Sequence, residues 1–335
     1  MIARMIYRGA SSETIVAKGN RLSNALISNS RSCAIGTSCA LTKVGDMCSK
    51  WREKFSAMNV PEPRQSVESI VAHVLNRKTL FGIEYSVELN DKQKETVDQL
   101  CMKRLERMPV QYIIGEWDFL DYTFILKPPV LIPRPETEEL VLFAEKDIRG
   151  AGMKFLEIGS GSGCVSISLL KRHETISGVA VDMSSEACSL TTLNAGKLGV
   201  SNRLEIHRHE ILANSASNEL FKGVSFDLIV SNPPYIPTAD MQHLPDEISK
   251  FEDSAALHGG SDGLDVVRNI LKFSSELLKP NGVLWMELDR THPSQIQHVL
   301  RQLKLDGEFG DLRTEIDFMK CPRFCRLVKL TPPNT

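Results

Sequence analysis

The sequence predicts an α/β protein in which a parallel, doubly wound sheet follows a small helical head. From about residue 150, short apolar segments alternate with segments of helical periodicity, the pattern of a parallel sheet covered by helices. Before residue 109, apolar residues recur mainly at helical spacing. With 335 residues, the chain is long enough for two folded units.

Composition excludes several classes of protein. Hydrophobic residues make up 42% and charged residues 24%, which argues against a disordered chain, a collagen or a coiled-coil rod. No apolar run approaches the roughly 18 residues that a membrane span needs. Residues 46–335 carry 34 basic and 41 acidic residues, a net charge of −7. That charge gives no general attraction for nucleic acid.

The first 45 residues have the composition of a targeting segment. They contain six basic residues, seven serines and a single acid, Glu13, without a sustained apolar pattern. This composition predicts a transit peptide and favours the mitochondrial matrix, and a merely disordered tail is the alternative. A secretory signal is disfavoured because Arg4 and Arg8 interrupt the apolar residues near the start.

The cysteines and histidines do not indicate a metal site. None of the eight cysteines forms a C-x-x-C pair, and Cys321 and Cys325 have no second pair or histidine cluster nearby. A structural zinc site needs about four convergent ligands. His207 and His209 alternate along a predicted strand, where packed histidines are expected more often than ligands. We therefore expect no metal, and free thiols in a reducing compartment.

The head, residues 46–108, is predicted to be a small helical bundle that binds or positions a partner. Apolar residues follow helical spacing over 66–75, with Ser66 as the expected cap, and again over 91–108. Residues 109–132 are expected to link the two parts. Within them, 117–132 is aromatic and β-branched, which predicts a β-hairpin with Asp121 at its turn.

The body, residues 133–335, supplies the elements of the sheet. Five segments are expected to be buried strands: 154–158, 177–182, 203–209, 226–231 and 283–288. Four helices are expected between and after them: 163–172, 184–198, 262–278 and 293–304. Because no helix separates 309–318 from 324–330, these last segments are expected to close the sheet as an antiparallel pair.

A glycine-rich loop follows the first predicted strand of the body. Its five residues are Gly159, Ser160, Gly161, Ser162 and Gly163, and a helix begins directly after them. Glycines allow positive φ and close approach of a ligand to the backbone, and the helix N-terminus offers unpaired N–H groups. Asp182 ends the next strand, where a carboxylate can accept hydrogen bonds from ribose hydroxyls. The spacing fails the dinucleotide fingerprint, because residue 164 is Cys and residue 166 is Ser.

The pattern that stands here, E-x-G-x-G-x-G starting at Glu157, resembles the S-adenosylmethionine loop of class I methyltransferases. The resemblance implies S-adenosylmethionine as cofactor and a seven-stranded, doubly wound fold.

A second motif, Ser231-Asn232-Pro233-Pro234-Tyr235, follows the fourth predicted strand. Ligands bind at the carboxyl edge of a parallel sheet, and the two prolines stiffen the loop there. The Asn232 side chain and the Pro233 carbonyl can accept both hydrogens of a substrate –NH₂ group, while Tyr235 offers a flat face. Such acceptors aim the lone pair of a poorly nucleophilic amide or aromatic amine at the methyl donor. A simple turn is the alternative.

The Asn-Pro-Pro-Tyr motif leaves the substrate open. It resembles the motif of adenine-N6 DNA methyltransferases and also that of protein glutamine-N5 methyltransferases. A DNA enzyme must flip a base and grip phosphates, which favours a basic cleft, whereas this body is acidic. A non-catalytic module that keeps an inherited cofactor pocket is a further alternative.

Five motifs in order make the chain resemble the HemK/PrmC family of release-factor glutamine methyltransferases, over about residues 50–330. They are PVQYIIGEWDF (109–119), LIPRPETEELV (131–141), EIGSGSGC (157–164), SNPPYIP (231–237) and AALHGGSDGL (255–264). The resemblance implies methylation of the side-chain amide nitrogen of the glutamine in the Gly-Gly-Gln loop of a class I release factor. With the targeting-like N-terminus, it implies a mitochondrial member and a mitochondrial release factor as protein substrate.

The resemblance also implies roles for individual residues. The glycines of the loop line the methionine part of the cofactor, Asp182 takes its ribose, and Glu210 and Ile211 bracket its adenine. Four further residues are expected to contact the cofactor: Glu157, Ser160, Ser162 and Asn232. Asn232, Pro233, Pro234 and Tyr235 hold the glutamine amide, and Arg134 to Glu138 form part of the wall near the cofactor. The same Arg134–Glu138 segment is also a helix start by its own pattern, with Pro135 in the first turn.

The chain departs from the family pattern at two places. Glu252-Asp253 stands where the family commonly has Glu-Pro, and Glu287-Leu288-Asp289 where it commonly has Glu-Ile-Gly. These departures put local loop shape in doubt, and the sequence assigns no role to these residues.

Overall fold

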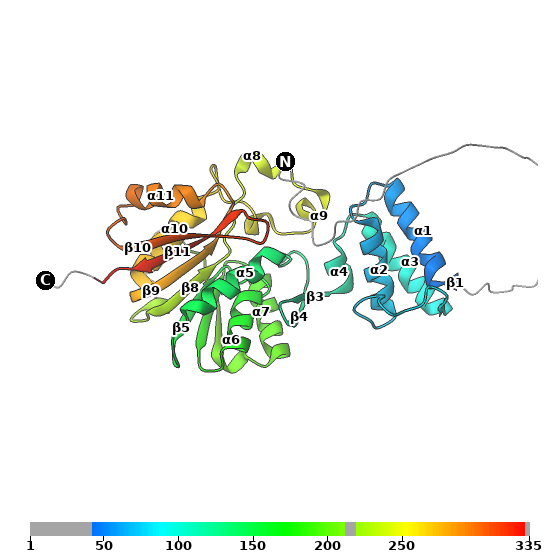
Figure 1. Cartoon of the computed structure of the whole chain (residues 1–335), viewed down its shortest axis with the longest axis horizontal. Coiled ribbons are helices and arrows are strands. Elements are labelled where there is room, and N and C mark those ends of the chain that lie inside the picture. The colour runs from blue at the N-terminus through cyan, green and yellow to red at the C-terminus, as the bar shows by residue number, and fades with distance from the viewer. Residues whose placement is uncertain (1–41, 212–218, 332–335) are drawn as a thin grey trace, which may run out of the picture. The chain divides into compact units, whose positions relative to one another are not determined.

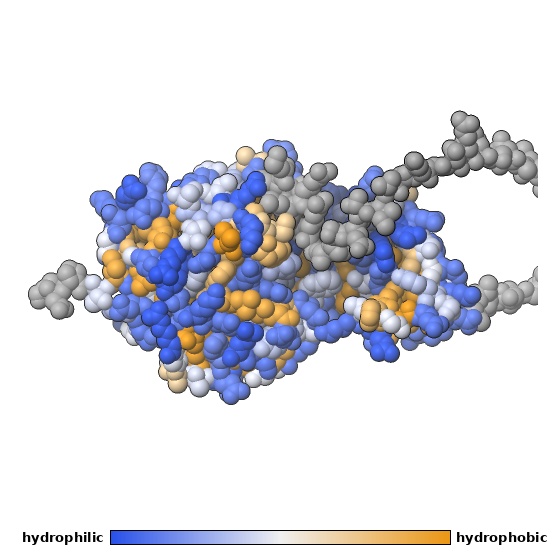
Figure 2. Space-filling view, viewed as in Figure 1, coloured by the Kyte–Doolittle hydropathy of each residue, from blue (hydrophilic) through white to orange (hydrophobic). Residues whose placement is uncertain are grey.

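The computed structural model describes residues 42–211 and 219–331 (Figure 1). The chain divides into two compact units, Met1–Met102 and Lys103–Thr335. Most of the segment predicted to be a transit peptide lies outside the described residues. Within the described ranges, no helix is long and apolar enough to cross a membrane. The space-filling view in Figure 2 shows mainly hydrophilic residues on the visible face, with apolar residues scattered among them.

The first unit is built on three helices. They are α1 (Val44–Ala57), α2 (Pro63–Val74) and α3 (Asp91–Leu105), with a two-residue pairing of β1 (Thr42–Lys43) and β2 (Glu88–Leu89). Trp51 is buried and donates its indole N–H to the Asp98 carboxylate at 2.6 Å, which ties α1 to α3. Phe55 and Ile70 are also fully buried, so the predicted helical head has its own apolar core.

Two details of the head differ from the prediction. Ser66 is not a cap, because α2 begins at Pro63 and Ser66 is buried within its first turns. Proline is well placed at the first helical position, where its missing N–H costs nothing. The helix α1 was not predicted, although its buried side chains Val44, Met47, Trp51 and Phe55 follow helical spacing.

The predicted hairpin is present but shorter than expected, and it packs on the body of the second unit. After α4 (Val110–Ile114), strands β3 (Glu116–Phe119) and β4 (Tyr122–Ile125) pair antiparallel around Leu120–Asp121. Asn194 of α7 accepts from the Ile125 N–H at 2.8 Å and donates to the Ile125 carbonyl at 3.0 Å. A buried amide therefore continues the edge of the hairpin and anchors it to the body.

Seven strands form one sheet in the order β10-β11-β9-β8-β5-β6-β7. Their bounds are β5 (Lys154–Ile158), β6 (Ser177–Asp182), β7 (Leu204–Arg208), β8 (Phe226–Ser231), β9 (Leu278–Glu287), β10 (Phe309–Ile316) and β11 (Pro322–Lys329). Strands β5 to β9 pair parallel, and β10 and β11 add an antiparallel pair beside β9. The predicted strands and the antiparallel closure are confirmed. The chain order reverses between β5 and β8, which is the switch point of the sheet.

Helices cover both faces of the sheet (Figure 1). One face carries α5 (Pro135–Ala144), α6 (Cys164–Arg172) and α7 (Ser185–Leu198), and the other carries α10 (Asp265–Leu277) and α11 (Ile296–Gln302). Strand residues alternate between the two cores, as Leu228 and Val230 do with Ile229. The short helices α8 (Thr238–Met241) and α9 (Asp246–Ser249) lie in the connection from β8 to α10.

A buried charge cluster ties the two C-terminal strands to the end of α5. Asp147 accepts from both Nε and Nη2 of Arg326 on β11, at 2.8 and 2.7 Å, and from the indole N–H of Trp285 on β9 at 2.9 Å. Burial raises the pKa of Asp147, but the Arg326 and Trp285 hydrogen bonds outweigh burial and hold it below its usual value. The carboxylate is therefore ionised and fully engaged.

We predict that Asp147→Ala lowers the free energy of unfolding of the second unit by about 3 kcal/mol, because it leaves a buried guanidinium without its main partner. Asp311→Ala is the matched control, since Asp311 pairs with the same arginine at 2.6 Å but has a side chain that is 42% exposed. The control should cost less than about 1 kcal/mol. Urea unfolding measures both, and equal losses would contradict the prediction.

Candidate functional site

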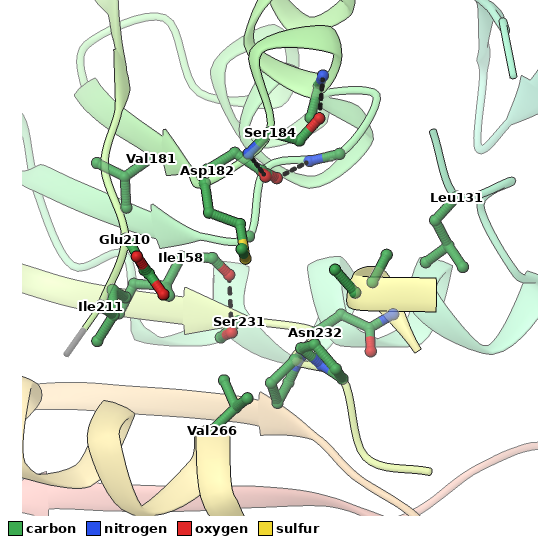
Figure 3. Close-up of a pocket in the computed structure, with 18 of the residues that line it drawn as sticks. Leu131, Ile158, Val181, Asp182, Ser184, Glu210, Ile211, Ser231, Asn232 and Val266 are labelled. Carbon is green, nitrogen blue, oxygen red and sulfur yellow. Dashed lines mark hydrogen bonds between the residues drawn. The ribbon is translucent and has the colours of Figure 1, made fainter. Parts of the chain in front are cut away.

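A cavity of about 230 Å³ opens at the carboxyl edge of the sheet, between the loops that follow β5 and β8. The two strands are neighbours, with Ile158 opposite Ser231, and the Ser231 hydroxyl donates to the Ile158 carbonyl at 2.7 Å. In Figure 3, Glu210 and Ile211 lie at one end of this cavity and Asn232 at the other. The switch point of the sheet thus brings the two sequence motifs to one site.

The glycine loop has the backbone that the sequence predicted. Gly159, Gly161 and Gly163 have φ of +78°, +53° and +80°, a region that favours glycine. Gly159 and Gly161 line the cavity. Gly163 does not line it, and an added Cβ there would lie 2.8 Å from the Ile167 side chain and 2.9 Å from that of Thr191. The third glycine therefore serves the packing of α6 against α7.

Side chains of α7 support the glycine loop from behind. The Thr191 hydroxyl is bonded to the Gly161 carbonyl at 3.1 Å, and the Asn194 amide donates to the Ser162 carbonyl at 2.9 Å. Ser160 and Ser162 are buried under the loop and do not line the cavity. Their expected contact with a cofactor stays a prediction without support from the cavity lining, because Gly159 and Gly161 face the cavity while the serines between them face the protein interior.

Asp182 connects the glycine loop to the end of β6. Its Oδ2 accepts from the Gly161 N–H and its Oδ1 from the Ser184 N–H, both at 2.9 Å. A carboxylate has about four acceptor positions, so acceptor capacity remains beyond these bonds, and Asp182 lines the cavity (Figure 3). Burial raises the pKa of Asp182 above its ordinary value despite the backbone N–H donors of Gly161, Ser184 and Met183.

Glu157 is not where the sequence analysis placed it. Its side chain is buried and does not line the cavity, and its Oε2 accepts from the Ser166 N–H at 3.0 Å in the first turn of α6. A carboxyl there satisfies one of the unpaired N–H groups of the helix. The structure therefore does not bring Glu157 to the cavity, and its observed contact holds the start of α6 under the loop.

Glu210 and Ile211 line the far end of the cavity, and apolar side chains from two other elements line the same end. Val181 comes from β6 and Val266 from α10, and the Asn269 amide donates to the Ile211 carbonyl at 3.4 Å. His209, beside them, packs its ring against Phe221 and Phe273. In the described part of the chain, no cluster of three or more His, Cys, Asp or Glu is arranged to hold a metal ion.

The loop after β8 places its amide and prolines at the other end. Asn232, Pro233 and Pro234 line the cavity. Asn232 is half-buried, and its Nδ2 donates to the Thr137 hydroxyl of α5 at 3.1 Å. The segment Arg134–Glu138 therefore does start a helix, and it also reaches the site through Thr137.

Tyr235, predicted to contact the substrate, does not line this cavity, and its substrate contact stays a prediction. It is half-buried beside the loop 259–263, where a Cβ added to Gly259 would lie 2.8 Å from the Tyr235 Cα. Burial and the nearby Glu287 carboxyl raise the pKa of its phenol above the usual value. Close packing of the 259–263 backbone against residue 235 holds the position of Tyr235. The sequence around Tyr235 has no pattern that indicates this contact.

Several lining residues were not predicted from the sequence. They come from the segment before α5, from the connection to α10 and from α10 itself: Pro129, Val130, Leu131, Asp253, Ala255, Ala256, Val266, Asn269 and Ile270. The sequence signals for them were the LIPRPETEELV and AALHGGSDGL motifs, which run beside these positions without showing which side chains face the cavity.

The residues of the cavity fit S-adenosylmethionine. A carboxylate with free acceptor positions suits the ribose hydroxyls, and the apolar pair Val181 and Ile211 suits the flat base. Gly161 has positive φ and space around the position of a Cβ, so its backbone can be approached closely. The polar and apolar groups of the cavity are therefore placed as the ribose and the base of S-adenosylmethionine require.

Two family models match the chain: the PrmC N-terminal domain over residues 46–115 and the methyltransferase small domain over residues 140–249. The chain is 38% identical over 304 residues to the human MTRF1L release factor glutamine methyltransferase, covering 87% of this chain and 89% of that protein. It is 33% identical over 276 residues to the release factor glutamine methyltransferase of Chlorobaculum tepidum, covering 80% and 91%. A solved methyltransferase from Pyrococcus furiosus is similar with a TM-score of 0.44 and 16% identity, over 62% of this chain and 89% of that one.

We predict that Asp182→Ala raises the Kd for S-adenosylmethionine by at least about 10-fold, because charge-assisted hydrogen bonds to the ribose and the anchor of the Gly161 N–H are both lost. Isothermal titration calorimetry on the full chain measures the change. Glu174→Ala removes an exposed carboxylate from the same unit and should leave the Kd unchanged. An unchanged Kd in Asp182→Ala would contradict the assignment.

We predict that Glu157→Gln makes the stability of the protein less sensitive to a rise in pH between about 4.5 and 8. Burial raises the pKa of Glu157 to about 8, so the folded state holds a proton that the unfolded chain releases near its ordinary pKa of 4.5. The free energy of unfolding should therefore fall as pH rises from about 4.5 to 8. Glutamine keeps an acceptor for the Ser166 N–H without titrating, so its Tm advantage over the wild type should grow across this range. Parallel Tm curves would contradict this.

Proposed function

We propose, from the premise that this chain belongs to the release factor glutamine methyltransferase family, that it methylates the side-chain amide nitrogen of a release-factor glutamine. Membership follows from the identity to the human and Chlorobaculum tepidum relatives over at least four fifths of this chain. The protein is an enzyme of the methyltransferase class, with S-adenosylmethionine as its cofactor. The acceptor we propose is the glutamine of the Gly-Gly-Gln loop.

One observation carries the proposal: the Asn232 amide stands at the cavity opposite the residues suited to the nucleoside, with its NH₂ group already engaged by Thr137. Its oxygen is then the end available to a substrate N–H. The Pro233 carbonyl, on the same loop, is proposed as the acceptor for the second hydrogen of the glutamine –NH₂. Two acceptors and no donor suit an amide nitrogen as the reacting group.

The chemistry requires orientation more than acid or base strength. S-adenosylmethionine supplies a methyl group on a cationic sulfur, which becomes a neutral thioether when the methyl group leaves. The amide lone pair is delocalised, and hydrogen bonds from its N–H groups to Asn232 and Pro233 hold the nitrogen in line with the methyl carbon. Such orientation contributes up to about 7–11 kcal/mol to lowering a barrier. The proton that the nitrogen loses after transfer can pass to solvent at the mouth of the cavity.

We propose that the helical head, residues 46–108, recognises the release factor outside its Gly-Gly-Gln loop, and that residues 133–335 carry out the transfer. The match of residues 46–115 to the PrmC N-terminal domain supports a head shared with the family. The net charge of −7 over residues 46–335 disfavours a nucleic-acid substrate. We further propose a mitochondrial release factor and the mitochondrial matrix, from the basic, serine-rich composition of residues 1–45.

The test uses the full chain, S-adenosylmethionine labelled in its methyl group, and a mitochondrial class I release factor. We expect label on the intact factor and none on a factor with Gln→Ala in its Gly-Gly-Gln loop. Equal label on both factors would overturn the proposed acceptor. Label on mitochondrial RNA or DNA instead would favour nucleic-acid methylation. No label anywhere, with cofactor binding intact, would favour a non-catalytic module.

We predict that Asn232→Ala lowers the rate of methyl transfer by at least about 100-fold, because the amide nitrogen loses the acceptor that orients it. Binding of S-adenosylmethionine should stay within a few-fold of the wild type. Asn202→Ala, an exposed asparagine in the same unit, is the control. Transfer near the wild-type rate in Asn232→Ala would refute its assigned role.

A further inference from the structure

The two ends of an asparagine side chain have nearly the same shape and opposite hydrogen-bonding character. Only the oxygen can accept from a substrate –NH₂, and a 180° turn of the amide would present a second donor instead. The proposed reaction therefore needs something in the protein that fixes which end of Asn232 faces the cavity. Prolines at 233 and 234 stiffen the backbone but do not control this turn.

Thr137 contacts the nitrogen end of the Asn232 amide. The Asn232 Nδ2 donates to the Thr137 Oγ1 at 3.1 Å. Thr137 lies in the first turn of α5, is 2% exposed, and has its own N–H bonded to the Arg134 carbonyl at 3.0 Å. A hydroxyl can serve as acceptor or donor, so Thr137 alone would allow either orientation of the amide.

Glu287 removes this ambiguity. It ends β9, the neighbour of β8 in the sheet, and its side chain is 1% exposed. The Thr137 side chain lies within hydrogen-bonding reach of its carboxyl and lowers its pKa. An ionised carboxylate can only accept a hydrogen bond. The Thr137 hydroxyl therefore donates its one hydrogen to Glu287, and its oxygen can only accept from Asn232. The chain of bonds runs in one direction, from Asn232 through Thr137 to Glu287.

We propose that Thr137 and Glu287 are positioning residues that fix the Asn232 amide with its oxygen toward the substrate. The inference rests on the proposed function, since it assigns a purpose to the orientation of Asn232. The other carboxylate oxygen of Glu287 has no hydrogen-bond partner among the described residues. A buried oxygen without a hydrogen-bond partner lowers stability. A carboxyl that served only the stability of the fold would not be expected at this position.

The surroundings of Glu287 allow it to change its protonation near neutrality. Its pKa is raised to about 7, chiefly by burial. The Thr137 side chain, Arg323 and Arg134 lower the pKa, and Glu136 raises it, and the value of about 7 includes all of these effects. These groups come from α5 and β11. Tyr235 of the loop after β8 and Cys164 of α6 also feel its charge.

Protonated Glu287 can donate to Thr137, whose hydroxyl would then donate to the Asn232 oxygen and reverse the amide. The ionised form is therefore the one that supports transfer, and kcat should rise with pH through about 7.

The first test compares Thr137→Val with Thr137→Ser. Valine keeps the shape of threonine without a hydroxyl, so we expect kcat to fall about 10-fold or more with the KM for S-adenosylmethionine unchanged. Serine keeps the hydroxyl and should retain most of the wild-type kcat. Thr192→Val makes the same change at an exposed position of α7 and should have no effect. A kcat within about two-fold of the wild type in Thr137→Val would overturn the proposal.

The second test uses Glu287→Gln, which can still accept from Thr137 through its side-chain oxygen but does not titrate. Its kcat should lose the rise between pH 6 and pH 8 that the wild type shows. A structural role for Glu287 would change the amount of folded protein without changing the shape of this profile. The same pH dependence in both proteins would overturn the role of Glu287.

A third measurement separates this inference from the proposed function. In the full chain labelled with ¹⁵N-asparagine, the Asn232 side-chain NH₂ signals are identified by their loss in Asn232→Ala. We expect Thr137→Val to shift these signals and Thr137→Ser to preserve them, without any substrate. If the signals respond but no release factor is methylated, the orientation of Asn232 stands and the proposed function fails. If methylation occurs and the signals do not respond, the positioning role fails.

Discussion

The site depends on the pairing of two parallel strands at the point where the order of the sheet reverses. Because β5 and β8 are neighbours with Ile158 opposite Ser231, the loops after them leave the same edge side by side. Gly159 and Asn232 are the next residues along each strand, and a Cβ on Gly159 would lie 3.8 Å from the Asn232 carbonyl oxygen. The hydrogen bond from the Ser231 hydroxyl to the Ile158 carbonyl closes this junction. The pairing register of β5 and β8 therefore sets the positions of both the glycine loop and the Asn232 loop.

Four carboxyl groups hold the parts of the site around that junction, each with a different partner; Asp182 is half-buried and the other three are buried. Asp182 accepts from the backbone of the glycine loop, and Glu157 accepts from the start of α6. Glu252 receives a two-oxygen contact from the Arg134 guanidinium at 2.8 Å, which fixes the chain just before α5. Glu287 lies within hydrogen-bonding reach of the Thr137 side chain. Burial is the largest cause of the raised pKa of all four, so the site combines rigidity with groups whose charge is costly to maintain.

Much of this arrangement could be predicted because it depends on local pattern. Periodicity and composition predict the strands, the helices between them and the antiparallel closure of the sheet. They also predict the positive φ of Gly159, Gly161 and Gly163. The sequence could not show which residues of the loop face the cavity, because neighbours in sequence face opposite ways. Ser160 and Ser162 point into the interior, and Glu157 lies beneath the loop, because a tight turn separates adjacent side chains by direction and not by distance along the chain.

The sequence by itself determined the fold class, the two motifs at strand ends and the family resemblance, since these require only the order and spacing of residues. The tertiary structure alone decided which of those residues meet. Thr137 and Glu287 stand 95 and 55 residues from Asn232, on α5 and β9. Nothing in their local sequence indicates that Thr137 contacts Asn232 or that Glu287 lies beside Thr137. Such contacts arise because helix α5 packs over the edge of a sheet whose strand order differs from the chain order. Long-range hydrogen bonds between buried polar groups are fixed by that packing and have no periodicity from which they could be predicted.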